Sequence, residues 1–202
     1  IQGQIGGQET LGEIKFKELL SPNAQLGGGY QFNELFGMRL SVNAWQSKAG
    51  MKVADATYNW KWNYVAPSLD ATLDLTNLFG GFNPERLVSV NVFAGLGANI
   101  AFNNDAAATA KSDIMAANNM GGYEPLAYLW DGAKAYMKGS VGTMVDFNLT
   151  ERLSLGLELA ATTLSDKFNS KKAGNTDWYF NTLAGVKYTF GKKYTKRSVP
   201  VE

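Results

Sequence analysis

Charged side chains are the residues of this sequence with the clearest capacity for chemistry, because the chain contains neither histidine nor cysteine. These two absences remove the commonest general base and metal ligand, and they exclude thiol catalysis, disulfides and zinc–thiolate sites. Asp70 and Asp74 share one face of a predicted strand, but their Cα atoms would lie about 13 Å apart, too far to share a catalytic proton. The sequence therefore predicts no enzyme, no cofactor and no metal site.

Glycine-rich and charged stretches also lack the context of a known chemical site. Gly27-Gly28-Gly29 and Gly95-Leu96-Gly97 precede no predicted helix, so they do not form phosphate-binding loops. Glycine in a strand instead allows a close approach by its neighbours. The chain has 19 basic and 18 acidic residues, and this near balance gives no overall field to attract nucleic acid.

The elements that must position these residues are strands, because polar and apolar residues alternate with a period of two along most of the chain. Val88, Val90 and Val92 begin one face of a long segment, and Ser89 and Asn91 begin the other. No segment has the uniformly apolar character of a transmembrane helix. We predict eight strands, at residues 1–8, 23–32, 36–47, 58–75, 87–102, 135–148, 153–164 and 178–190.

The connections between these strands alternate in length. Those after the first, third, fifth and seventh strands run from about ten to about thirty residues, and the longest, about 103–134, is expected to hold a short helix at 107–118. Short turns repeat a pattern in which Phe-Asn or a related pair precedes an Arg-Leu strand start, as at Phe147-Asn148 and Arg152-Leu153. Alternation of short turns and long loops is typical of outer-membrane barrels.

The faces of the strands indicate a barrel that sits in a membrane. One face carries Leu, Val, Ala and aromatic residues, and the other carries Gly, Ser, Asn and a few ionised groups. An eight-stranded barrel has a narrow interior that side chains fill, so charges of both signs must pair there. The apolar faces then need lipid outside. The predicted interior ion network consists of Arg39, Asp70, Asp74, Lys138, Asp146, Glu158 and Lys187.

Aromatic residues gather where the strands should meet the two membrane surfaces, and we predict two girdles. Pro67 cannot donate a ladder hydrogen bond, so a bulge is expected there that turns Trp60, Trp62 and Tyr64 outward. One girdle, near the short turns, would contain Phe32, Phe36, Phe82, Phe147, Tyr188 and Phe190. The other, near the long loops, would contain Trp60, Trp62, Tyr136, Trp178 and Phe180.

The layout of eight strands with four long loops resembles the OmpA-type transmembrane domain. The end of the last strand, from Gly185 through Tyr188 to Phe190, is similar to the terminal signal that the barrel-insertion machinery reads. The family pattern also favours a polar residue two positions before the glycine, where this chain has Leu183. The resemblance covers nearly the whole chain and implies no catalytic motif.

Fold and function follow as expectations from these patterns and from the resemblance. Residues 1–190 should form an all-β, eight-stranded, antiparallel, up-and-down transmembrane barrel, and residues 191–202 a periplasmic tail or the start of a linker. OmpA-like proteins anchor the outer membrane to peptidoglycan through a further domain, which implies a structural role here. The alternatives are a small channel and a soluble, lipocalin-like, ligand-binding barrel.

Location and partners are expected accordingly. Both termini should be periplasmic in a Gram-negative-type outer membrane, with the long loops outside. The expected partners are outer-membrane lipid and lipopolysaccharide, the insertion machinery during biogenesis, and peptidoglycan through a domain beyond Glu202. No nucleic-acid partner is expected.

Overall fold

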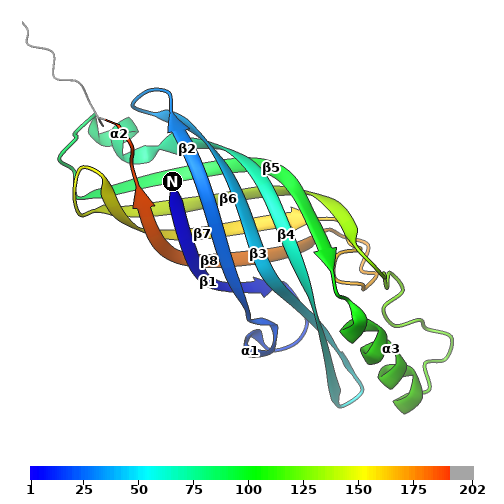
Figure 1. Ribbon diagram of the computed structural model, residues 1–202. Coiled ribbons are helices and arrows are strands. Elements are labelled where there is room, and N and C mark those ends of the chain that lie inside the picture. The colour runs from blue at the N-terminus through cyan, green and yellow to red at the C-terminus, as the bar shows by residue number, and fades with distance from the viewer. Residues whose placement is uncertain (192–202) are drawn as a thin grey trace, which may run out of the picture.

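The computed structural model describes residues 1–191 and shows a closed antiparallel β-barrel of eight strands in sequence order. Strand β8 pairs with β1 and completes the ring, as Figure 1 shows. The expected fold class is therefore confirmed. The strands are β1 (Gln2–Thr10), β2 (Ser21–Gln31), β3 (Phe36–Val53), β4 (Ala56–Asp74), β5 (Val88–Phe102), β6 (Lys134–Asn148), β7 (Leu153–Leu164) and β8 (Asp177–Tyr188).

Apolar side chains of the strands point away from the barrel. Leu40, Leu96 and Leu159 are 62%, 70% and 60% exposed, although each lies in a regular strand. The residues before and after each of them along the strand point inward and are polar, glycine or alanine, because successive strand residues point to opposite sides of a sheet. A soluble barrel would have the reverse distribution, so the outer surface is suited to lipid.

The short turns are closed by side chains that accept backbone hydrogen bonds. Asn33 Oδ1 accepts from the amides of Leu35 and Phe36, at 2.9 and 2.8 Å. Thr150 Oγ1 accepts from the amide of Leu153 at 2.9 Å. These contacts explain the repeated turn pattern in the sequence, since Asn and Thr side chains satisfy amides that the ladder leaves unpaired. The connection from β4 to β5 is longer and contains α2 (Leu75–Gly80).

The opposite end of the barrel carries the larger connections (Figure 1). Helix α1 (Phe16–Leu19) lies between β1 and β2, and α3 (Asp105–Ala117) lies between β5 and β6. The connection between β3 and β4 differs from the expected loop of about ten residues. Strands β3 and β4 continue as a paired hairpin as far as Val53 and Ala56, so only two residues join them. Alternation in residues 48–58 is weak, which is why the sequence indicated a loop.

The predicted bulge at Pro67 is absent. The pairing of β3 with β4 keeps one register from Phe36–Leu73 to Val53–Ala56, with Val42 opposite Pro67. On the other side of β4, pairing with β5 is interrupted only next to the proline and resumes in the same register. The strand therefore tolerates the missing amide N–H of Pro67 without a change in which residues of β4 point inward and which point outward. No helix among residues 1–191 is long and apolar enough to cross a membrane.

Candidate functional site in the barrel interior

The interior nearer the short turns holds an ion layer, formed by Arg39, Asp70, Lys138 and Glu158. The Arg39 guanidinium contacts Asp70 Oδ2 at 2.9 Å and Glu158 Oε2 at 2.6 Å. These three residues come from β3, β4 and β7, so the closed ring brings together residues that are far apart in sequence. All four side chains are buried, and two cations are balanced by two carboxylates.

Neutral groups complete the surroundings of these charges. Ser68 Oγ donates to Asp70 Oδ1 at 2.9 Å, and Gln25 Nε2 donates to Glu158 Oε1 at 3.1 Å. The Arg39 guanidinium also lies 4.5 Å from the centre of the Phe93 ring. Buried charges are costly unless they are paired and hydrogen-bonded, and this layer satisfies both conditions around Arg39.

Lys138 and Gly95 show how tightly the layer is packed. Lys138 Nζ donates to Ser140 Oγ at 3.3 Å and forms no ion pair with the described residues. Gly95 pairs with Asp70 across the ladder, and a Cβ atom there would lie 2.0 Å from Asp70 Oδ1. A glycine at this position is therefore required by the carboxylate that fills the space beside it.

The remaining members of the predicted ion network lie closer to the short turns. Lys187 Nζ contacts Asp146 Oδ2 at 2.6 Å, which links β8 to β6. Asp74 does not join the interior ion pairs and is a correction to the prediction. Its carboxylate instead caps α2, accepting from the amide of Asn77 at 2.8 Å, because β4 ends at this residue. A cavity of about 10 Å³ beside Lys187 has room for about one water molecule.

A polar layer occupies the middle of the barrel and consists of Gln8, Asn23, Asn43, Ser47 and Tyr64. Asn43 Nδ2 donates to Asn23 Oδ1 at 2.6 Å, and Asn23 Nδ2 donates to the Tyr64 hydroxyl at 2.6 Å. Gln8 is hydrogen-bonded both to Ser47 and to Tyr64. The network spans the four strands β1 to β4. All five side chains are buried, so it has no access to bulk water.

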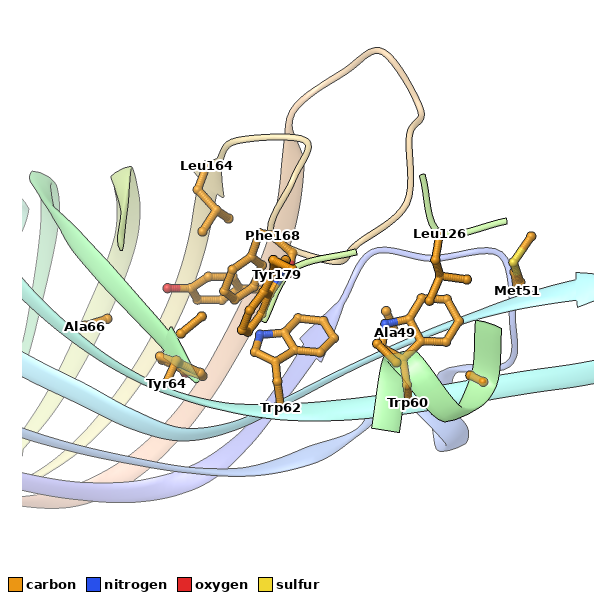
Figure 2. Packing of buried hydrophobic residues seen from close by; sticks show 14 of the residues in the cluster. Ala49, Met51, Trp60, Trp62, Tyr64, Ala66, Leu126, Leu164, Phe168 and Tyr179 are labelled. Carbon is orange, nitrogen blue, oxygen red and sulfur yellow. The ribbon is translucent and has the colours of Figure 1, made fainter. Parts of the chain in front are cut away.

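The end of the interior nearer the long loops is filled by aromatic side chains, which we call the mouth cluster: Trp62, Tyr136, Phe168 and Tyr179. Phe168 belongs to the connection between β7 and β8, and its ring sits edge-on to Trp62 with 5.1 Å between ring centres. The centres of Tyr136 and Tyr179 each lie 5.9 Å from it. Figure 2 shows Phe168 beside Tyr179 and Trp62 in this end of the barrel.

Long loops form an apolar cap beyond the mouth cluster. Trp60 and Leu126 lie together there, with α3 packed beside them through buried Ala107 and Ile114 (Figure 2). Trp60 Nε1 donates to the carbonyl of Asn169 at 3.0 Å. Outside this cap, a 2.6 Å hydrogen bond from Lys111 lowers the pKa of Glu124.

The position of Trp60 and Trp62 corrects the predicted girdle near the long loops. They are 2% and 0% exposed and point inward, because β4 alternates without a bulge at Pro67. Tyr136 likewise lies in the mouth cluster. Sequence analysis also missed Trp45, which is 59% exposed. Among the other predicted girdle residues, Trp178 is partly exposed, and Phe32, Phe36, Phe82, Phe147, Phe180, Tyr188 and Phe190 are exposed.

The predicted insertion signal lies at the end of β8. Gly185 faces inward, where a Cβ atom would lie 2.0 Å from the carbonyl oxygen of Gly3. The rings of Tyr188 and Phe190 are 5.0 Å apart at the surface. Recognition by an insertion machinery stays a prediction. Of the expected tail at residues 191–202, all but the first residue lie outside the described residues.

These layers fill successive sections of the interior and can hold the barrel shut. The described residues contain no cluster of acidic side chains able to hold a metal ion. Arg39 is bound to Asp70 and Glu158 at once, and with Lys138 the charges of this layer balance.

Comparison with known proteins agrees with the architecture. No family model matches the chain. The chain is 26% identical over 195 residues to Outer membrane protein 40 of Porphyromonas gingivalis, a match that covers 94% of this chain and 45% of that protein. The chain thus spans about half the length of this curated relative.

Two solved structures share the fold. Neisserial surface protein A superimposes with a TM-score of 0.56 at 13% identity, with 94% of this chain and 95% of that one covered. The N-terminal β-barrel domain of Pseudomonas aeruginosa OprF gives 0.51 at 13% identity, with 93% and 94% covered. The chain is an outer-membrane β-barrel protein, and the resemblance to OmpA-type barrels fits these findings.

Proposed function

We propose that this chain is a non-conducting anchoring barrel that ties the outer membrane to the cell wall through a domain beyond Glu202. The observation that carries the proposal is the filled interior. The ion layer, the polar layer and the mouth cluster follow one another along the barrel axis, so three different kinds of packing oppose a continuous water path. A barrel filled in this way has the properties of an anchor rather than of a pore.

The length of the relatives supports the second half of the proposal. Outer membrane protein 40 is about twice as long as the matched region, and the OprF structure is that of an N-terminal domain. A barrel that forms one part of a longer protein can hold the remainder at the membrane surface. Peptidoglycan is the proposed partner of that remainder, as the resemblance to OmpA-like proteins implies.

Orientation is part of the same proposal. The N-terminal residue and the end of β8 lie at the end with the short turns. The Ile1 ammonium donates to the carbonyl of Tyr188 at 2.8 Å, and Tyr188 pairs with Leu153, the first residue after the short turn between β6 and β7. We place this end in the periplasm, where a following domain would reach the cell wall. The long loops then face outward, and lipopolysaccharide surrounds the upper part of the barrel.

Planar-bilayer recording tests the anchor against the channel. The purified chain, refolded in detergent and added to a bilayer, should give no steady single-channel conductance. A large, steady conductance from the unmodified chain would favour the small channel and contradict the filled interior.

Sedimentation with isolated cell walls tests the linkage. The full-length gene product and a version ending at Glu202 should be incubated with detergent-washed peptidoglycan and pelleted. We expect the full-length protein in the pellet and the barrel alone in the supernatant. Full-length protein that stays in the supernatant would refute the linkage, whatever the conductance result.

A further inference from the structure

Two lysines face each other on the outer surface where the barrel rises toward the long loops. Lys48 of β3 pairs directly with Lys61 of β4. Lys61 lies between the inward-facing Trp60 and Trp62, and Lys48 lies between buried Ser47 and Ala49, so both lysines point outward. Residues opposite one another on antiparallel strands have Cβ atoms about 5 Å apart. The two ammonium groups therefore share one small area of the surface.

This arrangement is electrostatically unfavourable on its own, because like charges opposite one another destabilise a sheet. Neither lysine has an ion pair or a side-chain hydrogen bond anywhere in residues 1–191. The acidic groups of the neighbouring loop do not neutralise them. Glu13 lies 3.6 Å from Lys171, and Glu18 of α1 forms no ion pair with either lysine.

The loop above the pair carries no net charge that would offset the two lysines, because Lys15 and Lys17 balance Glu13 and Glu18. Gly50 lies two residues beyond Lys48 on the same outward face, and Ile14 covers it so closely that a Cβ atom there would clash with the Ile14 side chain. The connection between β1 and β2 thus lies against β3 just above the lysine pair.

The height of the pair on the barrel indicates what lies next to it. Leu73, opposite Phe36 at the lower edge of the apolar surface, is twelve residues from Lys61 along β4. At about 3.3 Å per residue and a strand tilt of about 40°, these residues are separated by about 30 Å along the barrel axis. The hydrocarbon core of a bilayer is about 30 Å thick, so the lysines stand at its upper boundary.

We propose that Lys48 and Lys61 together bind the phosphate group of a phosphorylated lipid in the leaflet that surrounds the long loops. Head-group phosphates lie just outside the hydrocarbon region, at the height of this pair. Two ammonium groups supply several hydrogen-bond donors to phosphate oxygens, and the anion removes the repulsion between them. The site rests on the membrane residence in the proposed function, but not on any link to the cell wall.

Native mass spectrometry of the chain released from detergent micelles tests this site. The probes are phosphatidic acid, which presents a phosphate monoester, and phosphatidylcholine, in which choline covers the phosphate. The test variant is K48Q/K61Q. The control K52Q/K172Q removes the same charge from two exposed positions above the pair. A heat-dependent gel shift should first establish that all three proteins are folded.

We expect the unmodified chain and the control to retain phosphatidic acid in preference to phosphatidylcholine. The K48Q/K61Q variant should bind phosphatidic acid about 30-fold more weakly, as expected for two cations at a membrane surface. Equal retention of phosphatidic acid by K48Q/K61Q and the control would overturn the site. Displacement of the lipid by an equal concentration of inorganic phosphate would identify a free-anion site and reject the lipid.

Failure of the proposed function has a different signature. If the chain is folded and monodisperse in detergent-free buffer, it does not reside in a membrane. That result would refute both the proposed anchoring function and the lipid site. A folded K48Q/K61Q variant that needs detergent but binds lipid normally would refute the lipid site alone.

Discussion

Arg39 forms two ion pairs in the barrel interior, more than any other described residue there. It contacts Asp70 and Glu158 at once and stacks against Phe93. Removal of this guanidinium breaks the ion pairs of two buried carboxylates and leaves Lys138 as the one cation of the layer. The layer is therefore stable only as a unit, which is the usual behaviour of buried ion pairs.

Replacement of Arg39 by Ala should destabilise the folded barrel by about 3–5 kcal/mol, the usual cost of stranding a buried partner. Guanidinium unfolding in lipid vesicles, followed by tryptophan fluorescence, measures the change in the free energy of unfolding. The matched control is Lys111→Ala, which removes a cation from a partly exposed pair on α3 and should leave that free energy unchanged. Equal stability of the two variants would show that the ion layer contributes nothing.

Gly95 offers a second test of the same layer without any change of charge. Gly95→Ala places a methyl group where Asp70 Oδ1 now lies, and Leu69 O is only 2.8 Å from that Cβ position. We expect a loss of about 1–3 kcal/mol in the same unfolding assay, as for other overpacked interiors. Gly139→Ala is the control, because its Cβ meets only side-chain atoms at 3.9 Å or beyond. Identical losses in both variants would argue against a crowded ion layer.

At the scale of elements, the connection between β7 and β8 closes the barrel end near the long loops. It inserts Phe168 among aromatic rings, and Asn169 donates from its amide to Asp177 Oδ2 at 2.8 Å. Trp130 Nε1 also donates to the carbonyl of Phe168, at 3.3 Å. Contacts from two loops and the barrel wall thus hold one side chain in the mouth.

Phe168→Ala should loosen this connection and leave the barrel closed. Truncation of a buried phenylalanine costs about 3–5 kcal/mol, and here the loss should fall on the loop. Hydrogen exchange should become faster in residues 165–176, while bilayer conductance stays absent because the ion layer remains. Tyr123→Ala, in the exposed part of the connection between β5 and β6, is the control. A steady conductance from Phe168→Ala would mean that the ion layer alone does not block the barrel.

The last strand carries the predicted insertion signal. Phe190→Ala should lower the amount of heat-shifted, folded protein recovered from outer membranes, because the exposed ring is expected to be read during insertion. The purified variant should refold in vitro to normal stability, since the side chain packs on little besides Tyr188. Phe79→Ala, at another exposed aromatic near the same end, is the control. If the Phe190→Ala variant assembles to wild-type levels, the end of β8 is not an insertion signal that depends on this ring.

For the whole molecule, the distribution of exposed carboxylates allows the proposed orientation to be tested with one protease. Glu13 and Glu124 lie on the side of the long loops, whereas Glu34, Glu85 and Glu151 lie on the side of the short turns. All five are exposed, but Glu124 precedes Pro125 and its peptide bond resists such a protease. A difference in cleavage between Glu13 and the three sites near the short turns would therefore report which side the protease reaches.

A glutamate-specific protease added to intact cells should cut after Glu13 and spare Glu34, Glu85 and Glu151. Mass spectrometry of the outer-membrane fraction identifies the fragments. Permeabilised cells are the control, in which cleavage after Glu34, Glu85 and Glu151 should appear. Cleavage after Glu151 in intact cells, with Glu13 spared, would invert the proposed topology.

The sequence by itself determined the number of strands and which residues of most strands share a face. Alternation with a period of two is a local property, so Leu153, Leu155 and Leu157 could be assigned to one face and Ser154 and Glu158 to the other without tertiary information. The turn residues Asn33 and Thr150 were also readable, because their side chains bond to amides within three residues.

Only the tertiary structure decided whether each face of a strand meets lipid, water or the packed interior at a given height along the barrel axis. Within the membrane the outer face must be apolar, but beyond it the outer face meets water and the interior becomes the apolar side. Strand β4 crosses this boundary, so Leu69 points to lipid while Trp60 and Trp62 point inward and Lys61 points out. The sequence pattern shows the alternation but not the height at which the preference reverses. Partners across the lumen, such as Arg39 and Glu158, likewise depend on closure of the ring, which no local pattern encodes.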